Sequence, residues 1–345
     1  MRNSCQRWAA AGIRQFYSRT VSQRAKNLGA GAFRSSKAPR VALRTNLLWS
    51  RPRWNYRPMP CDSRIVGQSF GPLEYDVDPF WTMAYAAGIG DASTCYLDST
   101  RAGGIIAHPV FPVCLATRVR WQMEPMFLAA GLTPEESLRS VHVTQQMTCH
   151  RAIRPPEKVA VTAVVTALQR RRAGTYVLSR YDICDVDGAP VSTIEWGRLW
   201  RDVGMTGPER PAPPLPSCEL RSELRATFRI PIAATAAIVY TACARADNQV
   251  SFHTDTTAAN RSGLKAPLLM GVATLAMCVS RIIESEAGSD PERIERISCR
   301  FGAMVFMPNE LTLQLYARDG DRIAFELMNS DGGHALRDGM VTLRD

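Results

Sequence analysis

The segment from residue 245 to residue 275 constrains this chain more than any other part of the sequence. His253 is followed two residues later by Asp255 and a short polar turn, and a Gly-Leu pair then leads to an apolar run opened by Gly271. The spacing of the apolar residues predicts one buried helix over residues 267–284. A titratable imidazole is therefore expected beside a helix N-terminus, whose unpaired backbone N–H groups could hold a developing negative charge.

Positive charge is concentrated at the beginning of the chain. Residues 1–61 contain eleven Arg, two Lys and no acidic residue, so this head carries +13 and the rest of the chain −3 of the total of +10. A slightly acidic body argues against a nucleic-acid-binding protein. The acid-free head, with Arg and Ser scattered through it, resembles a mitochondrial transit peptide. We therefore expect a mitochondrial protein; a cytoplasmic protein with a disordered basic tail is the alternative.

Membrane and metal chemistry have little support in the sequence. No apolar run approaches the roughly 18–20 residues that a membrane-spanning helix needs, so no span is expected. The ten cysteines are scattered without a Cys-x-x-Cys pair, and the other histidines are far from His253 in sequence. Neither a zinc site nor another metal site is expected, and no cofactor is indicated.

The first half is predicted over residues 62–205, and a proline-rich linker is predicted over residues 206–219. In the first half, Asp78 and Pro79 are a typical N-cap and first residue of a helix. Alternating polar and apolar residues then predict β-strands from residue 141 to residue 200. The sequence PERPAPPLP predicts an extended, semi-rigid linker.

The second half is predicted over residues 220–345 and repeats this order of elements. An apolar stretch at residues 230–240 predicts β structure before the motif, and short strands separated by turns follow the buried helix. A central helix wrapped by a curved antiparallel sheet, present twice, fits both halves. The expected fold class is therefore α+β.

The residues around His253 resemble the hydratase-2 motif of MaoC-like dehydratases, which have the double hot-dog fold. The family pattern reads roughly Asp-x-Asn-Pro-x-His-x-Asp, then Ala, then Gly-Phe, then Pro-Ile-x-His-Gly. Anchored on His253, the match runs without gaps through Asp255, Ala259, Gly263, Leu264, Pro267, Leu268 and Gly271. The resemblance implies reversible addition of water to a trans-2-enoyl thioester, carried by CoA or by an acyl carrier protein. It also implies that the other half widens an acyl pocket.

Three positions depart from the family pattern. The family's catalytic Asp falls on Asn248, and the nearest carboxylate is Asp247, one residue earlier. An amide cannot accept a proton at neutral pH, so Asn248 could orient water but could not act as the base. The family's Asn-Pro pair is replaced by Val250-Ser251, and Met270 replaces the histidine before the helix glycine.

The predicted site combines proton transfer with oxyanion stabilisation. His253 is the expected acid/base, Asp247 or Asn248 its water-positioning partner, and the Gly271 N–H the oxyanion donor. Asp255 is interpreted as a helix N-cap in preference to a catalytic group. The expected substrate-binding residues are Ser251, Met270, His108 and Lys265.

Two other functions stay open. The amide at position 248 and the missing Asn-Pro pair would suit a catalytically reduced hot-dog protein that binds acyl chains or scaffolds an assembly. The second alternative is a hot-dog thioesterase. The expected partner is an acyl-thioester substrate, and a homodimer is possible.

Overall fold

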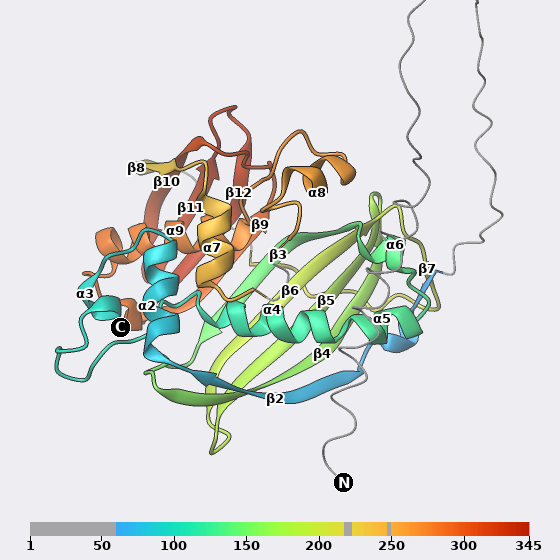
Figure 1. The fold of residues 1–345 in the computed structure, drawn as a ribbon, viewed down its shortest axis with the longest axis horizontal. Helices are drawn as coiled ribbons and strands as arrows, with labels where there is room; N and C mark the ends of the chain where they lie inside the picture. The colour runs from blue at the N-terminus through green and yellow to red at the C-terminus, as the bar shows by residue number, and fades with distance from the viewer. Residues whose placement is uncertain (1–59, 217–222, 247–249, 345) are drawn as a thin grey trace, which may run out of the picture. The chain divides into compact units, whose positions relative to one another are not determined.

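The computed structural model describes residues 60–216, 223–246 and 250–344. Nearly all of the basic head, part of the predicted linker, and the expected catalytic partners Asp247 and Asn248 lie outside these residues. The body consists of one large antiparallel sheet with helices packed against it (Figure 1).

The first half contributes most of the helices. Its helical elements are η1 (Ser63–Ile65), α2 (Pro79–Gly88), α3 (Thr94–Leu97), α4 (Pro112–Gln122), α5 (Glu124–Ala129) and α6 (Pro134–Ser137). Its strands are β1 (Cys61–Asp62), β2 (Ser69–Val77), β3 (Ser140–Cys149), β4 (Glu157–Arg171), β5 (Gly174–Asp185), β6 (Pro190–Arg201) and β7 (Met205–Thr206). The predicted start of α2 is confirmed, because the Asp78 carboxylate accepts a hydrogen bond from the Trp81 N–H at 2.8 Å.

The second half begins with a strand and a short helix. Its elements are β8 (Leu224–Ile232), α7 (Ala236–Cys243), α8 (Thr256–Arg261), α9 (Gly271–Glu286), η2 (Pro291–Arg293), β9 (Ile294–Phe301), β10 (Asn309–Asp319), β11 (Arg322–Met328) and β12 (His334–Leu343).

Two local predictions for this half were wrong in part. Residues 236–240 are helical rather than β, because they belong to α7, which packs against α2. The two helices are so close that a Cβ on Gly88 would lie only 2.7 Å from the Cys243 Cβ. The buried helix begins at Gly271 and not at residue 267. The Leu269 N–H donates to the Val305 carbonyl at 2.9 Å, which holds the preceding residues extended.

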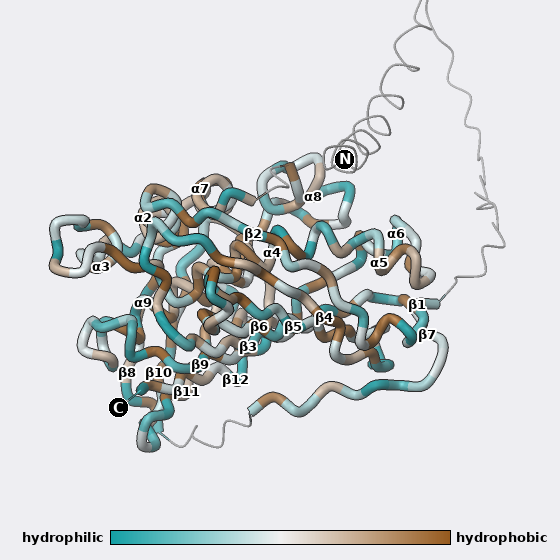
Figure 2. Tube along the Cα trace, turned by 90° about the horizontal axis from the view of Figure 1, so that it is seen from below, coloured by the Kyte–Doolittle hydropathy of each residue, from teal (hydrophilic) through white to brown (hydrophobic). Residues whose placement is uncertain are grey.

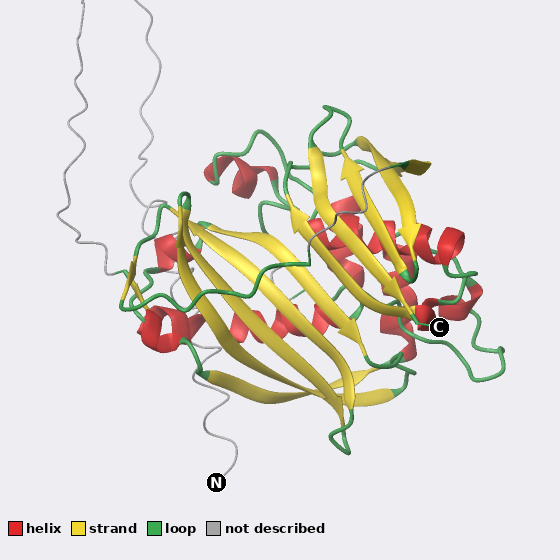
Figure 3. Cartoon of the chain, turned by 180° about the vertical axis from the view of Figure 1, so that it is seen from behind, coloured by secondary structure: helices red, strands yellow, loops and turns green. Residues whose placement is uncertain are grey.

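One ten-stranded sheet runs through both halves in the order β2-β4-β5-β6-β3-β9-β12-β11-β10-β8. The halves join where β3 pairs antiparallel with β9, with Met147 opposite Ile297. Seen from its outer side, the sheet lies in front of the central helices (Figure 3). The predicted α+β architecture is confirmed, with α4 and α9 as the central helices of the two halves.

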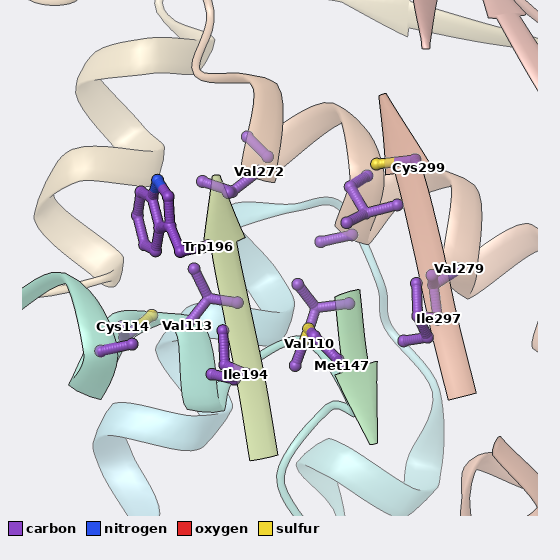
Figure 4. Packing of buried hydrophobic residues seen from close by; sticks show 14 of the residues in the cluster. Val110, Val113, Cys114, Met147, Ile194, Trp196, Val272, Val279, Ile297 and Cys299 are labelled. Atoms are coloured by element: carbon purple, nitrogen blue, oxygen red, sulfur yellow. The ribbon is translucent and has the colours of Figure 1, made fainter. Parts of the chain in front are cut away.

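The hydrophobic core is continuous across the junction of the halves. Hydrophobic segments gather toward the middle of the body, and hydrophilic segments lie toward its outside (Figure 2). Figure 4 shows side chains of α4, β3 and β6 from the first half beside those of α9 and β9 from the second. The labelled residues are all buried: Val110, Val113, Cys114, Met147, Ile194, Trp196, Val272, Val279, Ile297 and Cys299. The shared core fixes the position of α9 against the first half.

The described part of the predicted linker lies on the sheet. Arg210 forms two backbone hydrogen bonds with Leu168, at 2.8 and 2.9 Å, and the Ala212 N–H donates to the Gln169 side chain at 2.7 Å. None of the helices in the described ranges has both the length and the apolar character needed to cross a membrane. The eight cysteines within these ranges are free thiols.

Candidate active site

A tight turn before α8 holds His253. The Ser251 carbonyl accepts hydrogen bonds from the N–H groups of Thr254, at 3.0 Å, and Asp255, at 2.9 Å. The Ser251 hydroxyl accepts from the His253 N–H at 3.2 Å. The Asp255 carboxylate accepts from the Ala258 N–H at 2.7 Å, which confirms Asp255 as the N-cap of α8. Ser251 and Asp255 therefore set the backbone from which the imidazole projects.

The His253 imidazole is half-buried and bound through one nitrogen. Its Nδ1 lies 2.7 Å from the Leu268 carbonyl oxygen. Because a carbonyl only accepts, Nδ1 carries the proton and Nε2 keeps its lone pair. Among the described residues, none hydrogen-bonds to Nε2. This tautomer is the one that a general base requires.

Burial is the main influence on the protonation of His253. It lowers the pKa of this histidine to about 4, the hydrogen bond to Leu268 opposes the shift, and the positive charge of Arg120 adds to it. The imidazole is therefore neutral near pH 7.

Leu268 connects His253 to the start of α9. Met270 is the N-cap residue of this 16-residue helix, and its carbonyl accepts from the Ala273 N–H at 3.0 Å. Gly271 is the first residue of the helix, and the described part of the chain offers its N–H no backbone acceptor. The positive end of the helix dipole lies at the same place. A neutral imidazole is thus hydrogen-bonded to the segment that leads into α9, and a helix-opening N–H donor follows three residues later.

Phe301, the last residue of β9, packs against Gly271. A Cβ built on Gly271 would lie 2.5 Å from the Phe301 Cδ1, so the ring approaches the helix where only glycine leaves room. The Phe301 ring also contacts the His142 ring of β3, with 4.3 Å between centroids. Sequence reasoning identified Gly271 but missed Phe301 and His142, since strand pairing alone brings them here.

Two predicted substrate-binding residues flank Leu268 in the chain. The Met270 Sδ lies 4.0 Å from the Thr241 Oγ1 of α7. The Lys265 Nζ stands 4.5 Å from the centre of the Phe306 ring. The substrate-binding roles of Met270, Lys265 and Ser251 stay predictions.

His108 lies apart from the other predicted site residues, at the junction of the halves. Its Nδ1 accepts from the Val110 N–H at 3.1 Å, so Nε2 carries the proton and donates to the Ser280 Oγ of α9 at 3.2 Å. It lines a small cavity of about 20 Å³ that does not include His253 or Gly271. His108 links α9 to the first half, and its contact with substrate stays a prediction.

Three histidines with depressed pKa values predict a loss of stability in mild acid. Burial lowers the pKa of His108 and of His253 from 6.5 to about 4, and it lowers the pKa of His142 well below 6.5. As pH falls below 6.5, these histidines become protonated in the unfolded chain, whereas in the folded chain they stay neutral down to about pH 4. The free energy of unfolding therefore decreases between pH 6.5 and about pH 4. Each histidine contributes up to about 1.4 kcal/mol per pH unit.

Urea unfolding between about pH 7 and about pH 5 measures this slope. We expect His108→Asn to reduce it, whereas replacing the exposed His150 by Asn should leave it unchanged. A free energy of unfolding that does not change over this range would contradict the prediction.

Sequence reasoning also missed polar side chains on the helix-facing side of the first-half sheet. Ile194, Trp196, Arg198 and Trp200 alternate along β6 toward the core, and all four are buried. The sequence carries one signal that could have identified them, because it places an arginine at an inward position of an otherwise apolar strand. Among the described residues, none forms a cluster of three or more His, Cys, Asp or Glu suited to a metal ion.

Two family models match this chain. Residues 64–194 match the FAS1-like, dehydratase domain region, and residues 220–333 match the MaoC like domain. Among curated proteins, the UPF0336 protein of Saccharopolyspora erythraea is 27% identical over 145 residues, which are 40% of this chain and 89% of that protein.

Solved structures share the fold. The MaoC-like dehydratase from Phytophthora capsici superposes with a TM-score of 0.72 at 17% identity, over 81% of this chain and 96% of that one. A conserved hypothetical protein from Mycobacterium tuberculosis, described as having a double hotdog fold, gives a TM-score of 0.52 at 13% identity, over 81% of this chain and 96% of that one. At these identities the likeness establishes the double hot-dog fold and nothing finer.

Proposed function

Since this chain belongs to the MaoC-like dehydratase family, with a FAS1-like region followed by a MaoC-like domain, we propose that it hydrates trans-2-enoyl thioesters reversibly. The substrate is an acyl thioester of CoA or of an acyl carrier protein. The observation that carries the proposal is the hydrogen bond from His253 Nδ1 to the Leu268 carbonyl. It leaves the basic Nε2 unbonded among the described residues and ties the imidazole to the chain three residues before Gly271, which opens α9.

The proposed hydration step uses both groups. His253 Nε2 takes a proton from water as the water oxygen attacks C3 of the enoyl group. The electrons of the double bond move toward the thioester, whose oxygen becomes negative and accepts a hydrogen bond from the Gly271 N–H. Return of the proton to C2 gives the 3-hydroxyacyl thioester.

A pKa of about 4 makes His253 a weak base in the free protein. General bases work best when their pKa lies near the operating pH. We propose that Asp247 is the carboxylate that raises the basicity of His253, and that Asn248 positions the water. Both lie outside the described residues.

Incubation with crotonyl-CoA tests the function, with loss of the enoyl absorbance and release of free thiol followed together. Loss of absorbance without thiol release supports hydration. Thiol release as the first event would overturn the proposal in favour of a hot-dog thioesterase. Binding without either change would favour the catalytically reduced acyl-binding protein that the Asn248 substitution suggests.

We also propose that residues 1–61 direct the protein to mitochondria, because the head carries thirteen basic residues and no acid. A fluorescent protein fused behind these residues should colocalise with a mitochondrial marker. The same fusion with the arginines replaced by glutamine should not. A cytoplasmic distribution of the unaltered fusion would contradict this proposal.

A further inference from the structure

The face of the first-half sheet that packs against α4 carries an inner polar cluster. It is formed by Arg120 of α4, His142 and Gln145 of β3, Tyr181 of β5, and Trp196 and Arg198 of β6. Strand register places the sheet residues together, since Arg198 lies opposite His142 and Trp196 lies opposite Gln145. Residues opposite each other in an antiparallel pair share a face. Figure 4 shows Trp196 in the core that α4 and α9 share.

The inner polar cluster contains buried polar atoms without partners. Arg120 Nε, Trp196 Nε1 and Arg198 Nη2 are all buried, and each lacks a hydrogen-bond partner among the described residues. Folded proteins leave few such atoms, and each needs an explanation. Three such atoms, two on one strand of the sheet and one on the helix that packs over it, indicate that the cluster is completed by something that the described residues do not supply.

The two guanidinium groups are the unusual members. Arg198 is only 3% exposed, and within the described ranges neither Arg198 nor Arg120 forms an ion pair or hydrogen bond. Burial lowers the pKa of Arg120 to about 10, which still leaves it charged near pH 7. A buried charge without a counter-ion strongly destabilises a folded protein.

Aromatic rings account for part of this arrangement. The Arg198 guanidinium lies 4.7 Å from the Phe127 ring centre and 5.1 Å from that of Trp200. Arg120 lies 4.0 Å from the Trp121 ring centre. Such contacts stabilise a cation through the ring face, but a π face cannot satisfy the N–H groups at the edge of the guanidinium. The unpaired Nε and Nη2 atoms are edge donors of this kind.

The inner polar cluster adjoins the candidate active site. His142 stacks on Trp196, with 4.2 Å between centroids and 17° between planes, and its other neighbour is Phe301, which packs against Gly271. The charge of Arg120 is close enough to lower the pKa of His253. The rings of Phe301, His142 and Trp196 thus connect Gly271 to the two arginines, so a thioester held at Gly271 would lie on the same side of the sheet as they do.

We propose that Arg120 and Arg198 form an anion subsite for the acyl chain, so that the preferred substrate is an enoyl thioester whose chain ends in a carboxylate. This inference rests on the proposed function. A carboxylate matches the planar donor edge of a guanidinium and would give the buried Arg198 and the half-buried Arg120 a counter-ion. Neutralising Arg120 would also remove a charge that weakens His253 as a base. The carrier phosphates are disfavoured because Arg198 lies deep in the core, against the fully buried Trp200.

The experiment measures binding, so that it does not depend on turnover. Two saturated acyl-CoA thioesters of equal length, one ending in a carboxylate and one in a methyl group, are titrated calorimetrically into the full chain. We expect the carboxylated thioester to bind roughly 10- to 100-fold more tightly, as charged hydrogen bonds predict. Arg120→Met and Arg198→Met should each remove most of this preference. Arg201→Met is the matched control, since this arginine lies on the same strand and is exposed.

Equal affinity of the natural sequence for the two thioesters would overturn the inference. So would a loss of affinity for CoA itself in the arginine variants, because it would assign the guanidinium groups to the carrier phosphates. Thermal melting shows that each variant is folded, and Arg198→Lys, which keeps the charge, should retain part of the preference. If the protein hydrates crotonyl-CoA but binds the carboxylated and the methyl-terminated thioesters equally, the anion subsite is rejected and the proposed reaction is kept. A carboxylate preference without hydration would reject the proposed reaction alone.

Discussion

His253→Ala is expected to reduce the hydration rate of crotonyl-CoA by about 10²- to 10⁴-fold, the range typical of a lost general base. The structure provides the reason in one hydrogen bond. His253 Nδ1 donates to the Leu268 carbonyl at 2.7 Å, which fixes the tautomer and leaves Nε2 as a basic nitrogen. Alanine removes the proton acceptor, while Ser251 and Asp255 keep the backbone of the turn.

The matched control is His150→Ala. The His150 ring is exposed and hydrogen-bonds to the Thr193 hydroxyl at 3.1 Å, so the substitution removes an imidazole without touching the candidate site. Its hydration rate should equal that of the natural sequence. Thioester affinity measured alongside separates catalysis from binding. A His253→Ala protein that hydrates crotonyl-CoA at the natural rate would exclude this residue as the base.

Gly271→Pro is the second large effect that we expect, with a loss of roughly 10²- to 10³-fold in kcat, as for removal of one oxyanion-hole donor. Proline has no N–H, and the first position of a helix tolerates it because that N–H is unpaired within the helix. The preceding Met270 has φ −63° and ψ 136°, a conformation that a residue before proline can adopt. The substitution therefore removes the donor while leaving the start of α9 in place.

Gly271→Ala is the control that isolates the donor. Alanine keeps the N–H but places a Cβ 2.5 Å from the Phe301 Cδ1, so the ring must shift in this variant as it must in the proline variant. The ratio of the two kcat values then measures the contribution of the Gly271 N–H to catalysis. Melting curves of both proteins show whether α9 is intact. Equal kcat values for proline and alanine would mean that the Gly271 N–H does not stabilise the oxyanion.

Several elements could be predicted from the sequence because their causes lie within a few residues. Asp78 and Asp255 cap helices through hydrogen bonds to backbone N–H groups three residues later. The alternating residues of β6 predict a strand with one buried face. The apolar spacing of α9 predicts a buried helix, although its first residue depended on pairing with Val305.

The sequence by itself determined the two-half plan, the helix caps, and the imidazole followed by a glycine-opened helix. Each of these depends on local hydrogen bonds or on a periodicity of side chains that short segments carry. Only the tertiary structure decided that Phe301 packs on Gly271, that His108 joins α9 to the first half, and that Arg120 of α4 lies over the Trp196 ring of the strand that carries Arg198. These contacts depend on which strands pair, in which register, and on how helices pack over them. Residues far apart in the chain make them, and no local pattern specifies such distances.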